Sequence, residues 1–534
     1  MHRLIIVLGV FVCVLAAAPR AQNPQPPARA ASQASAKPDE QAYRAASKIK
    51  DPQERLRALR QFLADFPKSE RVTAAHSSII DVSLDIIAQA TRDVTAEIDA
   101  RMATAKDERN TCLEHFFLAF NMLRRDALLD LAEQHARAAL RHWDTPGTGD
   151  LPAAAGRSMA RADVQGLLGQ ILYKLGRQDE AEPLLRQAYE RSDTDFKFGL
   201  ASLPYLADIA LARGRETDAL TYMTEMELGG TLPAAKREQF QALYRKAHGG
   251  SLESLDQQLD ERYAATHPKP AVTPYEPGAA RTGRAVLAEA FTGAACGPCV
   301  GVDRAFDAVL DRYERGDVIV LMHHVHIPSP DPLANGATEA RQKFHGVGSA
   351  PHFFIDGVEP PSGGGGTADE AATILSKEIE PSLQRDLAKR PDARLSLRVS
   401  VKGTSVRAAV TADQIRQPSS TVKLHLALVE DHVRYVGRNG VRFHSMVVRA
   451  MAGDAAGIAL KGRNKVTAEQ VFDLGKVSAD LKAYLDDYEA HGEPPDYTFD
   501  EKKYRLDPTR LAVVVFLQDD ASKHVLQAAY APVK

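Results

Sequence analysis

The sequence predicts a multidomain protein made of an α-helical repeat array, an α/β domain and an antiparallel β-sandwich, in that order. Residues 40–265 carry apolar side chains at helical spacing, with short turns between the helices. In residues 283–388, apolar runs typical of buried strands alternate with helical segments, as in α/β domains. From residue 389 to 534 the pattern changes to a period of two, which is typical of antiparallel strands.

The overall composition is that of an ordinary globular protein. Of the 534 residues, 44% are hydrophobic and 26% are charged, so the chain can bury large cores. Its length favours about two to four domains. The formal net charge of −3 gives no electrostatic reason to expect binding to nucleic acid or to an anionic membrane.

The first residues have the features of a secretory signal peptide, which we place at residues 1–21. His2 and Arg3 precede an apolar run at residues 4–18, which is shorter than the roughly 20 residues of a membrane-spanning helix. Residues 22–39 are rich in Pro, Ala and Gln and predict a disordered linker. We therefore expect an exported protein, periplasmic or secreted, with no membrane span after cleavage. Cys13 would leave with the signal peptide.

An internal repeat lies within the helical region. The pattern around Gly176 and Ala181 recurs 38 residues later around Gly214 and Ala219. It resembles the tetratricopeptide repeat, in which small residues let paired helices approach closely, although the usual period of that repeat is about 34 residues. A generic helical array would give a similar pattern. Because arrays of this kind usually bind segments of other proteins, we expect a protein partner here, which no residue identifies.

The most informative motif follows a proline-rich linker at residues 266–282. Residues 286–291 predict a buried strand, residues 292–295 a tight turn, and residues 300–315 a helix. The sequence Cys296-Gly297-Pro298-Cys299 joins the turn to the helix. The first sulfur would therefore lie at a helix N-terminus, where unpaired N–H groups and the macrodipole favour the thiolate.

Thiol exchange explains this cysteine pair better than a structural role does. Closing so short a loop adds little stability. An exported protein held together by disulfides usually has many cysteines, whereas only Cys112, Cys296 and Cys299 would remain here after processing. Cys112 lies in a helical stretch, and we predict a buried inert thiol there rather than a resolving cysteine.

The order of elements around the cysteines resembles the thioredoxin superfamily, over roughly residues 283–385. A strand at residues 318–322, a helix at 337–344 and a strand at 352–357 follow the motif. The resemblance implies that Ala350-Pro351, just before the last strand, is a cis bond facing the two sulfurs. It also implies that Cys296 attacks a substrate disulfide and that Cys299 resolves the mixed disulfide.

Two positions depart from the family pattern. Ala295 stands where the family usually has tryptophan. The family also places a buried acid near the end of the strand before the motif, a position that falls on Ala290 when counted without gaps. Glu289 is one residue out of register, so either it points to solvent or the turn is one residue longer. We expect the longer turn and assign Glu289 as the proton acceptor.

The C-terminal region predicts the β-sandwich. A hairpin at residues 394–401 and 405–410 turns at Lys402-Gly403, and a glycine run at residues 363–366 predicts a flexible loop before it. This region has no visible catalytic constellation, so packing or partner binding is its expected role. Further strands are expected at residues 422–429, 441–449, 511–517 and 524–530, with a charged helix at 479–488.

Histidines near the motif raise the question of a metal. His324 and His326 follow the strand at residues 318–322, at the sheet edge where the cysteines also lie. Two cysteines with a histidine would suit copper or zinc. Copper-delivery proteins of the thioredoxin superfamily space their cysteines more widely, however, and Gly-Pro between cysteines favours exchange. We therefore expect no metal and no cofactor.

The sequence thus predicts an exported thiol–disulfide oxidoreductase that acts on protein disulfides, with a membrane partner as its electron donor. The expected site residues are Cys296, Cys299, Pro351 and Glu289. The competing hypothesis is a scaffold protein whose thioredoxin-like domain has lost turnover, and copper handling is a third.

Overall fold

The computed structural model describes residues 38–85, 90–105, 108–145, 151–152, 158–159, 161–191, 198–276, 282–361, 363–453, 455–494 and 497–534. The expected signal peptide and residues 22–37 of the expected linker lie outside these ranges. Backbone contacts divide the described chain into two compact units, whose boundary in the sequence falls between Met226 and Glu227.

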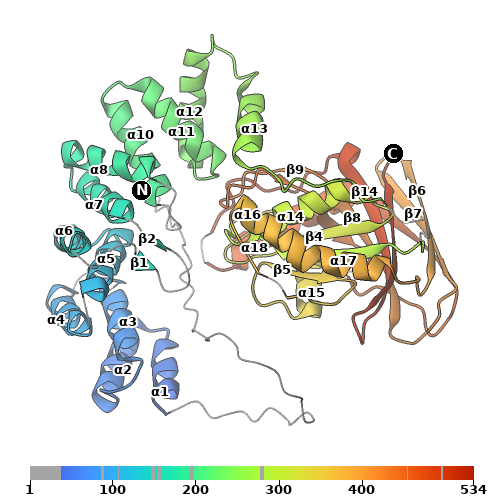
Figure 1. Ribbon diagram of the computed structural model, residues 1–534, viewed down its shortest axis with the longest axis horizontal. Coiled ribbons are helices and arrows are strands. Elements are labelled where there is room, and N and C mark those ends of the chain that lie inside the picture. The colour runs from blue at the N-terminus through green and yellow to red at the C-terminus, as the bar shows by residue number, and fades with distance from the viewer. Residues whose placement is uncertain are drawn as a thin grey trace. The chain divides into compact units, whose positions relative to one another are not determined.

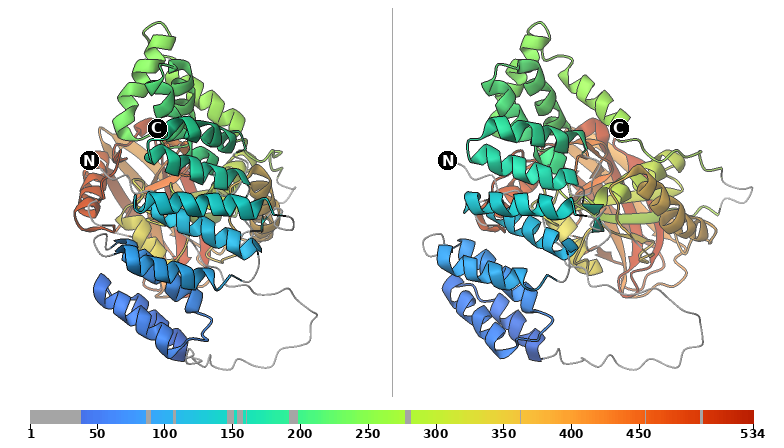
Figure 2. Two further views of the ribbon diagram at one scale, coloured as in Figure 1. Left: turned by 90° about the vertical axis from the view of Figure 1, so that its left-hand side faces the viewer. Right: turned by 60° about the vertical axis from the view of Figure 1, so that its left-hand side comes forward.

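The first unit is the expected helical array, in which successive helices stack beside one another (Figures 1 and 2). Asp51 illustrates how the sequence starts a helix, because its carboxylate accepts a hydrogen bond from the Glu54 N–H at 2.8 Å. The short strands β1 (Leu151–Pro152) and β2 (Ser158–Met159) were not expected. The helices are α1 (Pro38–Ser47), α2 (Pro52–Asp65), α3 (Val72–Asp85), α4 (Ala90–Met102), α5 (Glu108–Arg124), α6 (Leu129–Trp143), α7 (Arg161–Lys174), α8 (Gln178–Glu190), α9 (Phe198–Ala201), α10 (Leu203–Ala212) and α11 (Glu216–Leu228).

The internal repeat is visible in the geometry of α7–α8 and α10–α11. Gly176 and Gly214, which follow α7 and α10, have φ values of 79° and 68°, a left-handed conformation that glycine adopts without steric cost. A Cβ on Gly169 would lie 2.8 Å from Cγ of Leu185, so a small residue at this position lets α7 approach α8. Equivalent positions of the repeat therefore have the same local structure.

The second unit is built around an eight-stranded mixed sheet. The neighbouring strands run in the order β15-β14-β8-β11-β4-β3-β5, and β12 pairs with β8. Two further helices, α12 (Ala234–Ala247) and α13 (Leu255–Thr266), precede the sheet and belong to this unit. The strands are β3 (Val286–Thr292), β4 (Val318–His324), β5 (His352–Ile355), β8 (Val422–Glu430), β11 (Val447–Met451), β12 (Ile458–Ala459), β14 (Leu511–Asp519) and β15 (Val525–Pro532).

The segments expected to form separate α/β and β-sandwich domains share this sheet. β4 pairs in parallel with β11, where Met322 lies beside Val447, and β11 pairs antiparallel with β8. The sheet is therefore continuous across the boundary expected between residues 388 and 389. The strand periodicity could not reveal this, because it reports which faces are buried and not which strand lies alongside.

A second, three-stranded antiparallel sheet packs on part of the first. It has the order β13-β7-β6, from β13 (Val466–Asp473), β7 (Ser405–Asp413) and β6 (Arg394–Lys402). Val410 of β7, Leu426 of β8 and Val515 of β14 lie in one hydrophobic core between the two sheets. The predicted β6–β7 hairpin is confirmed, with Gly403 at a φ of 60° in its turn.

Helices complete the second unit. α14 (Cys299–Arg312) and α16 (Ala368–Ile374) pack against each other, and α15 (Gly336–His345) contacts β4 and β11 (Figure 1). A π-helical turn (Leu375–Ile379) and α17 (Glu380–Leu387) continue α16, and α18 (Leu474–His491) follows β13. No helix among the described residues is long and apolar enough to cross a membrane.

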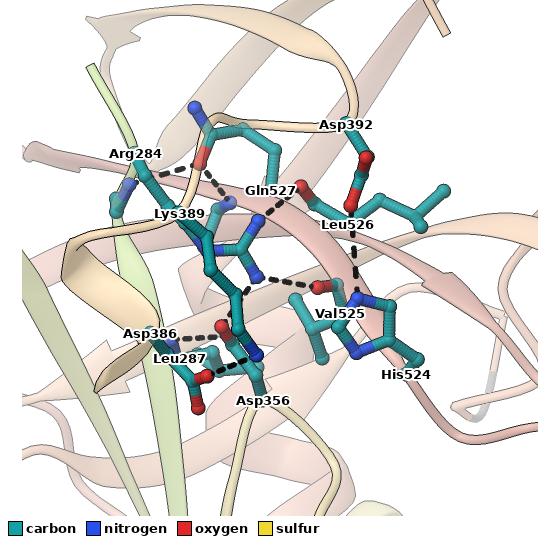
Figure 3. Close-up of polar contacts among 12 residues, drawn as sticks. Arg284, Leu287, Asp356, Asp386, Lys389, Asp392, His524, Val525, Leu526 and Gln527 are labelled. Carbon is teal, nitrogen blue, oxygen red and sulfur yellow. Dashed lines mark hydrogen bonds and ion pairs between the residues drawn. The ribbon is translucent and has the colours of Figure 1, made fainter. Parts of the chain in front are cut away.

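A buried ion pair ties the start of β3 to the last strand (Figure 3). Arg284 and Asp356 are paired at 2.5 Å, and both side chains are 1% exposed. The Arg284 guanidinium also donates to the carbonyls of Val525 and Leu526 at the beginning of β15. The segment that precedes the cysteine motif is therefore anchored to the C-terminal strand, β15.

Candidate redox site

The two cysteines form a disulfide at the start of α14. Cys296 and Cys299 are joined in the turn that links β3 to this helix. The Cys299 N–H donates to the Cys296 carbonyl at 3.2 Å, which closes the turn. Both residues are buried, with 2% of Cys296 and none of Cys299 exposed, whereas Gly297 and Pro298 between them are exposed. Cys296 is therefore the more exposed of the two residues, by a small margin.

A cis proline faces this disulfide. The Ala350–Pro351 peptide bond is cis, and the sulfur of Cys296 lies 3.6 Å from the Ala350 carbonyl oxygen. Both parts of the sequence-based prediction for Pro351, the cis bond and its position beside the cysteines, are confirmed. Ser349, Ala350 and Pro351 are partly exposed, so this loop is the accessible wall of the site.

The glycine run at residues 363–366, here called the glycine segment, covers another side of the motif. The Gly365 N–H donates to the Pro298 carbonyl at 2.8 Å, and the Gly301 N–H donates to the Gly365 carbonyl at 2.6 Å. A Cβ on Gly364 would lie 2.9 Å from Pro298 Cβ and 3.3 Å from Pro351 Cδ. Glycine is therefore required here for a physical reason, because a side chain would separate the segment from the motif.

A loop between β9 (Val433–Arg434) and β10 (Phe443–His444) holds the turn from a third direction. The Asn439 side-chain amide donates to the carbonyls of Gly293 and Cys296, each at 3.2 Å. Its backbone N–H donates to the Ala294 carbonyl at 3.1 Å. No sequence pattern pointed to Asn439, which lies 140 residues after the motif.

Glu289 is not placed to exchange a proton with the cysteines. Successive residues of β3 point to opposite faces of the sheet. Ala290 pairs with Phe353, whose ring packs on Phe306 of α14, so Ala290 faces that helix. Glu289 consequently faces the other side of the sheet, where α15 packs. The assignment of Glu289 as proton acceptor is therefore corrected.

A buried network surrounds Glu289 on that opposite face. Arg341 of α15 binds both carboxylate oxygens through Nη2, at 2.6 and 2.8 Å. The Nε2 atoms of His323 and His345 lie 3.1 and 3.3 Å away. Burial alone would raise the pKa of Glu289, but the Arg341 charge and the two imidazoles outweigh it and hold that pKa well below its usual range. Glu289 is therefore an ionised member of a buried network on the face of the sheet away from the cysteines.

A different carboxyl, Asp303, lies on the cysteine side of the sheet. It follows Cys299 by four residues on α14, so both share one helix face, with roughly 5–6 Å between the Cβ atoms of such pairs. Both carboxylate oxygens are buried, and neither makes a hydrogen bond of standard geometry within the described residues. Burial raises the pKa of Asp303 to about 7, against the opposing effects of His324 and Thr292. The four-residue spacing of Cys299 and Asp303 was visible in the sequence, but the burial of the Asp303 carboxyl was not.

The two candidate histidines are engaged by protein groups. His324 Nδ1 lies 2.9 Å from Asp331 Oδ2, and the same oxygen accepts the Ala294 N–H at 2.6 Å. His326 Nε2 lies 2.8 Å from the Tyr484 hydroxyl, and its ring stacks on Tyr488. Within the described residues, no group of three or more His, Cys, Asp or Glu side chains is arranged to hold a metal ion.

Cys112 lies in the helical unit and is a free, fully buried thiol. Its sulfur donates to the Ala139 carbonyl at 3.3 Å, and burial raises the pKa of the Cys112 thiol to about 11. The prediction of a buried thiol is therefore confirmed.

Comparison with known proteins adds little to this geometry. No family model and no curated protein matches the chain. Among solved structures, the chain is similar to the crystal structure of BtubC (BKLC) from P. vanneervenii, with 16% sequence identity and a TM-score of 0.29. The similarity covers 45% of this chain and 98% of that chain. At so low a TM-score it supports no conclusion about fold or function.

Proposed function

We propose that the protein catalyses thiol–disulfide exchange on protein substrates through Cys296 and Cys299. The observation that carries this proposal is the contact of the Cys296 sulfur with the carbonyl before cis Pro351, at 3.6 Å. The sulfur of the more exposed cysteine thus lies beside the partly exposed backbone of the cis-proline loop. An extended substrate can pair with this backbone. The order of β3, cysteine turn, α14, β4, α15, cis proline and antiparallel β5 supports a thioredoxin-like fold for this part of the unit.

The exchange has two bond-forming steps. In the reduced protein, the Cys296 thiolate attacks one sulfur of a substrate disulfide, forms a mixed disulfide and releases the other substrate sulfur as a thiolate. Cys299 then loses its proton and attacks the Cys296 sulfur. This step forms the Cys296–Cys299 bond, breaks the mixed disulfide and releases the second substrate thiolate. The substrate gains two electrons and the protein loses two.

Asp303 is the proposed acceptor for the Cys299 proton. Helical side chains lean toward the N-terminus and so approach the residue four positions earlier, which for Asp303 is Cys299. Both of its oxygens are buried, and burial favours the uncharged carboxyl, which is the form that has taken up a proton. A pKa near the working pH suits a group that must take up and release a proton in each cycle.

The remaining expectations belong to the same proposal. The protein is exported to the periplasm or secreted after removal of residues 1–21. A membrane partner returns electrons to the disulfide, and the tetratricopeptide-like helical array binds a protein partner. No residue of the described chain identifies either partner.

Insulin reduction by dithiothreitol tests the activity of the chain without residues 1–21. We expect the wild-type protein to accelerate insulin precipitation and Cys296→Ser to abolish this effect. Cys299→Ser should accumulate a mixed disulfide with the substrate, and Cys112→Ser is the matched control with wild-type activity. If the wild-type protein is inactive although reduced and folded, the proposal is wrong.

The second candidate is a scaffold protein without turnover. Two observations favour it: Ala295 replaces the family's tryptophan, and the glycine segment covers a disulfide of which at most 2% of either cysteine is exposed. The insulin assay separates the two candidates. Copper handling, the third, predicts stoichiometric Cu(I) binding to the reduced protein that is lost in His324→Ala or His326→Ala.

A further inference from the structure

A small cavity lies beside Asp303. Its volume is about 10 Å³, which is room for about one water molecule. The polar residues that line it come from three elements, namely α14, β4 and the segment around β10. They are Asp303, Asp307, His324, His444 and Ser445.

Asp307 lies one turn beyond Asp303 on α14, so the two carboxyls begin a row along the helix. Cys299, Asp303 and Asp307 are spaced by four residues and therefore share one helix face. The Ser445 hydroxyl donates to Asp307 Oδ1 at 2.6 Å. Asp307 is partly exposed, and the next carboxyl of the row, Asp311, is 54% exposed and paired with Lys269. The row therefore runs from the buried sulfur to the solvent.

The two histidines that line the cavity do not give a proton an equivalent route to the solvent. His444 Nε2 lies 3.0 Å from the Tyr435 carbonyl, so this nitrogen carries a proton and donates it. Burial lowers the pKa of His444 to about 3, which keeps the ring neutral. His324 Nδ1 is held by Asp331, which is itself 1% exposed. His444 is therefore kept as a neutral hydrogen-bond donor, and His324 is held by a buried carboxylate.

Cys299 needs an internal route because it is fully buried. We propose that the proton that leaves Cys299 during exchange passes to Asp303 and reaches the solvent across the cavity through Asp307. This inference rests on the proposed function and adds Asp307 and Ser445 as residues that act on the reaction without touching the reacting sulfurs. Asp307 takes up the proton from Asp303 by way of a water in the cavity.

Charged and polar groups on several neighbouring elements act on Asp303 and Asp307. Burial raises the pKa of Asp307 to about 6, against the Ser445 hydroxyl and Lys269. His324 and Asp331 act on Asp303 from β4 and the loop after it. Other groups whose charges act on one or both are Tyr263 of α13, Arg304 and Asp311 of α14, and Asp431. The dependence of the second exchange step on pH will therefore reflect all of these groups.

Stopped-flow reaction of the reduced protein with 5,5′-dithiobis(2-nitrobenzoate) separates the two chemical steps. Attack by Cys296 releases the first chromophoric thiolate, and attack by Cys299 releases the second. We expect Asp307→Asn to slow the second phase several-fold and to leave the first phase unchanged. Asp303→Asn should slow the second phase by about 10²-fold, as is typical for loss of a general base. Asp307→Glu should restore the rate.

Two further variants keep the test decisive. Asp480→Asn, an exposed carboxyl on α18 outside the row and paired with Lys476, is the control and should have wild-type kinetics. Ser445→Ala removes the hydrogen bond to Asp307 and should raise the pH midpoint of the second phase. A second phase that depends on Asp303 but not on Asp307 or Ser445 would overturn the route while leaving the exchange activity intact. A missing first phase would instead refute the proposed function.

Discussion

The sulfur of Cys296 lies 3.6 Å from the carbonyl oxygen of Ala350, so the cysteine turn and the cis-proline loop meet at the reactive atom. Two other segments hold the same turn. The glycine segment binds Pro298 and Gly301 through its backbone, and Asn439 binds the carbonyls of Gly293 and Cys296. The access of a substrate to the disulfide therefore depends on the contacts that the cis-proline loop, the glycine segment and Asn439 make with the cysteine turn.

The glycine segment should control how quickly the disulfide is reduced. In Gly364→Ala the new Cβ would lie 2.9 Å from Pro298 Cβ and 3.0 Å from the Pro298 carbonyl oxygen, which forces the segment away. We expect dithiothreitol to reduce the disulfide several-fold faster in this variant, as measured by a thiol assay over time. Gly366→Ala is the control, because its Cβ would come no closer than 3.9 Å to its nearest neighbour. Equal rates in both variants would show that the segment does not limit access.

Asp303 should make the stability of the oxidised protein depend on pH. Its pKa is 3.8 in an ordinary environment and about 7 in the fold, so the folded state binds the proton more tightly. The resulting stabilisation is complete below pH 3.8 and is lost as the pH rises through about 7. The uncharged Asp303→Asn variant should therefore resemble the wild type near pH 4 and be more stable than it at pH 8. Urea unfolding across this range measures the difference, and a difference independent of pH would contradict the prediction.

Glu289→Gln should impair stability rather than exchange. The substitution leaves the buried Arg341 charge without its partner, which typically costs about 3–5 kcal/mol of unfolding free energy. Urea unfolding at pH 7 measures this loss, and the exchange rate per folded molecule should stay at the wild-type value. Glu469→Gln is the control, since the Arg407–Glu469 pair is more than half exposed and such pairs contribute about 1 kcal/mol or less. A loss of exchange in folded Glu289→Gln would restore Glu289 as a proton acceptor.

Cys112 should not react in the folded protein. Its thiol is fully buried, and its pKa of about 11 leaves almost no thiolate at pH 8. Iodoacetamide at pH 8 should therefore label Cys296 of the reduced native protein and leave Cys112 unmodified, as peptide mass spectrometry would show. In urea, Cys112 should be labelled as well. Labelling of Cys112 before unfolding would mean that the helical unit opens locally.

Local patterns in the sequence were sufficient for most secondary structure and for the cysteine pair. The turn between β3 and α14 and the hairpin at Gly403 depend on residues close together in the chain, whereas the cis bond at Pro351 was expected from the resemblance to the thioredoxin superfamily. Their geometry is set by short-range sterics, hydrogen bonding and the conformational limits of glycine and proline. For the same reason, the repeat at Gly176 and Gly214 could be recognised from the spacing of residues alone.

The tertiary structure alone decided which groups surround the cysteines. Glu289 and Asp303 were both near the motif in sequence, but the alternation of β3 turns Glu289 to the far face, and the helical period brings Asp303 to the cysteine side. Likewise, β4 pairs with β11, although the sequence pattern predicted that these two strands belong to different domains. Strand partners and buried charges depend on contacts between residues far apart in the chain, and a periodicity within one segment carries no information about them.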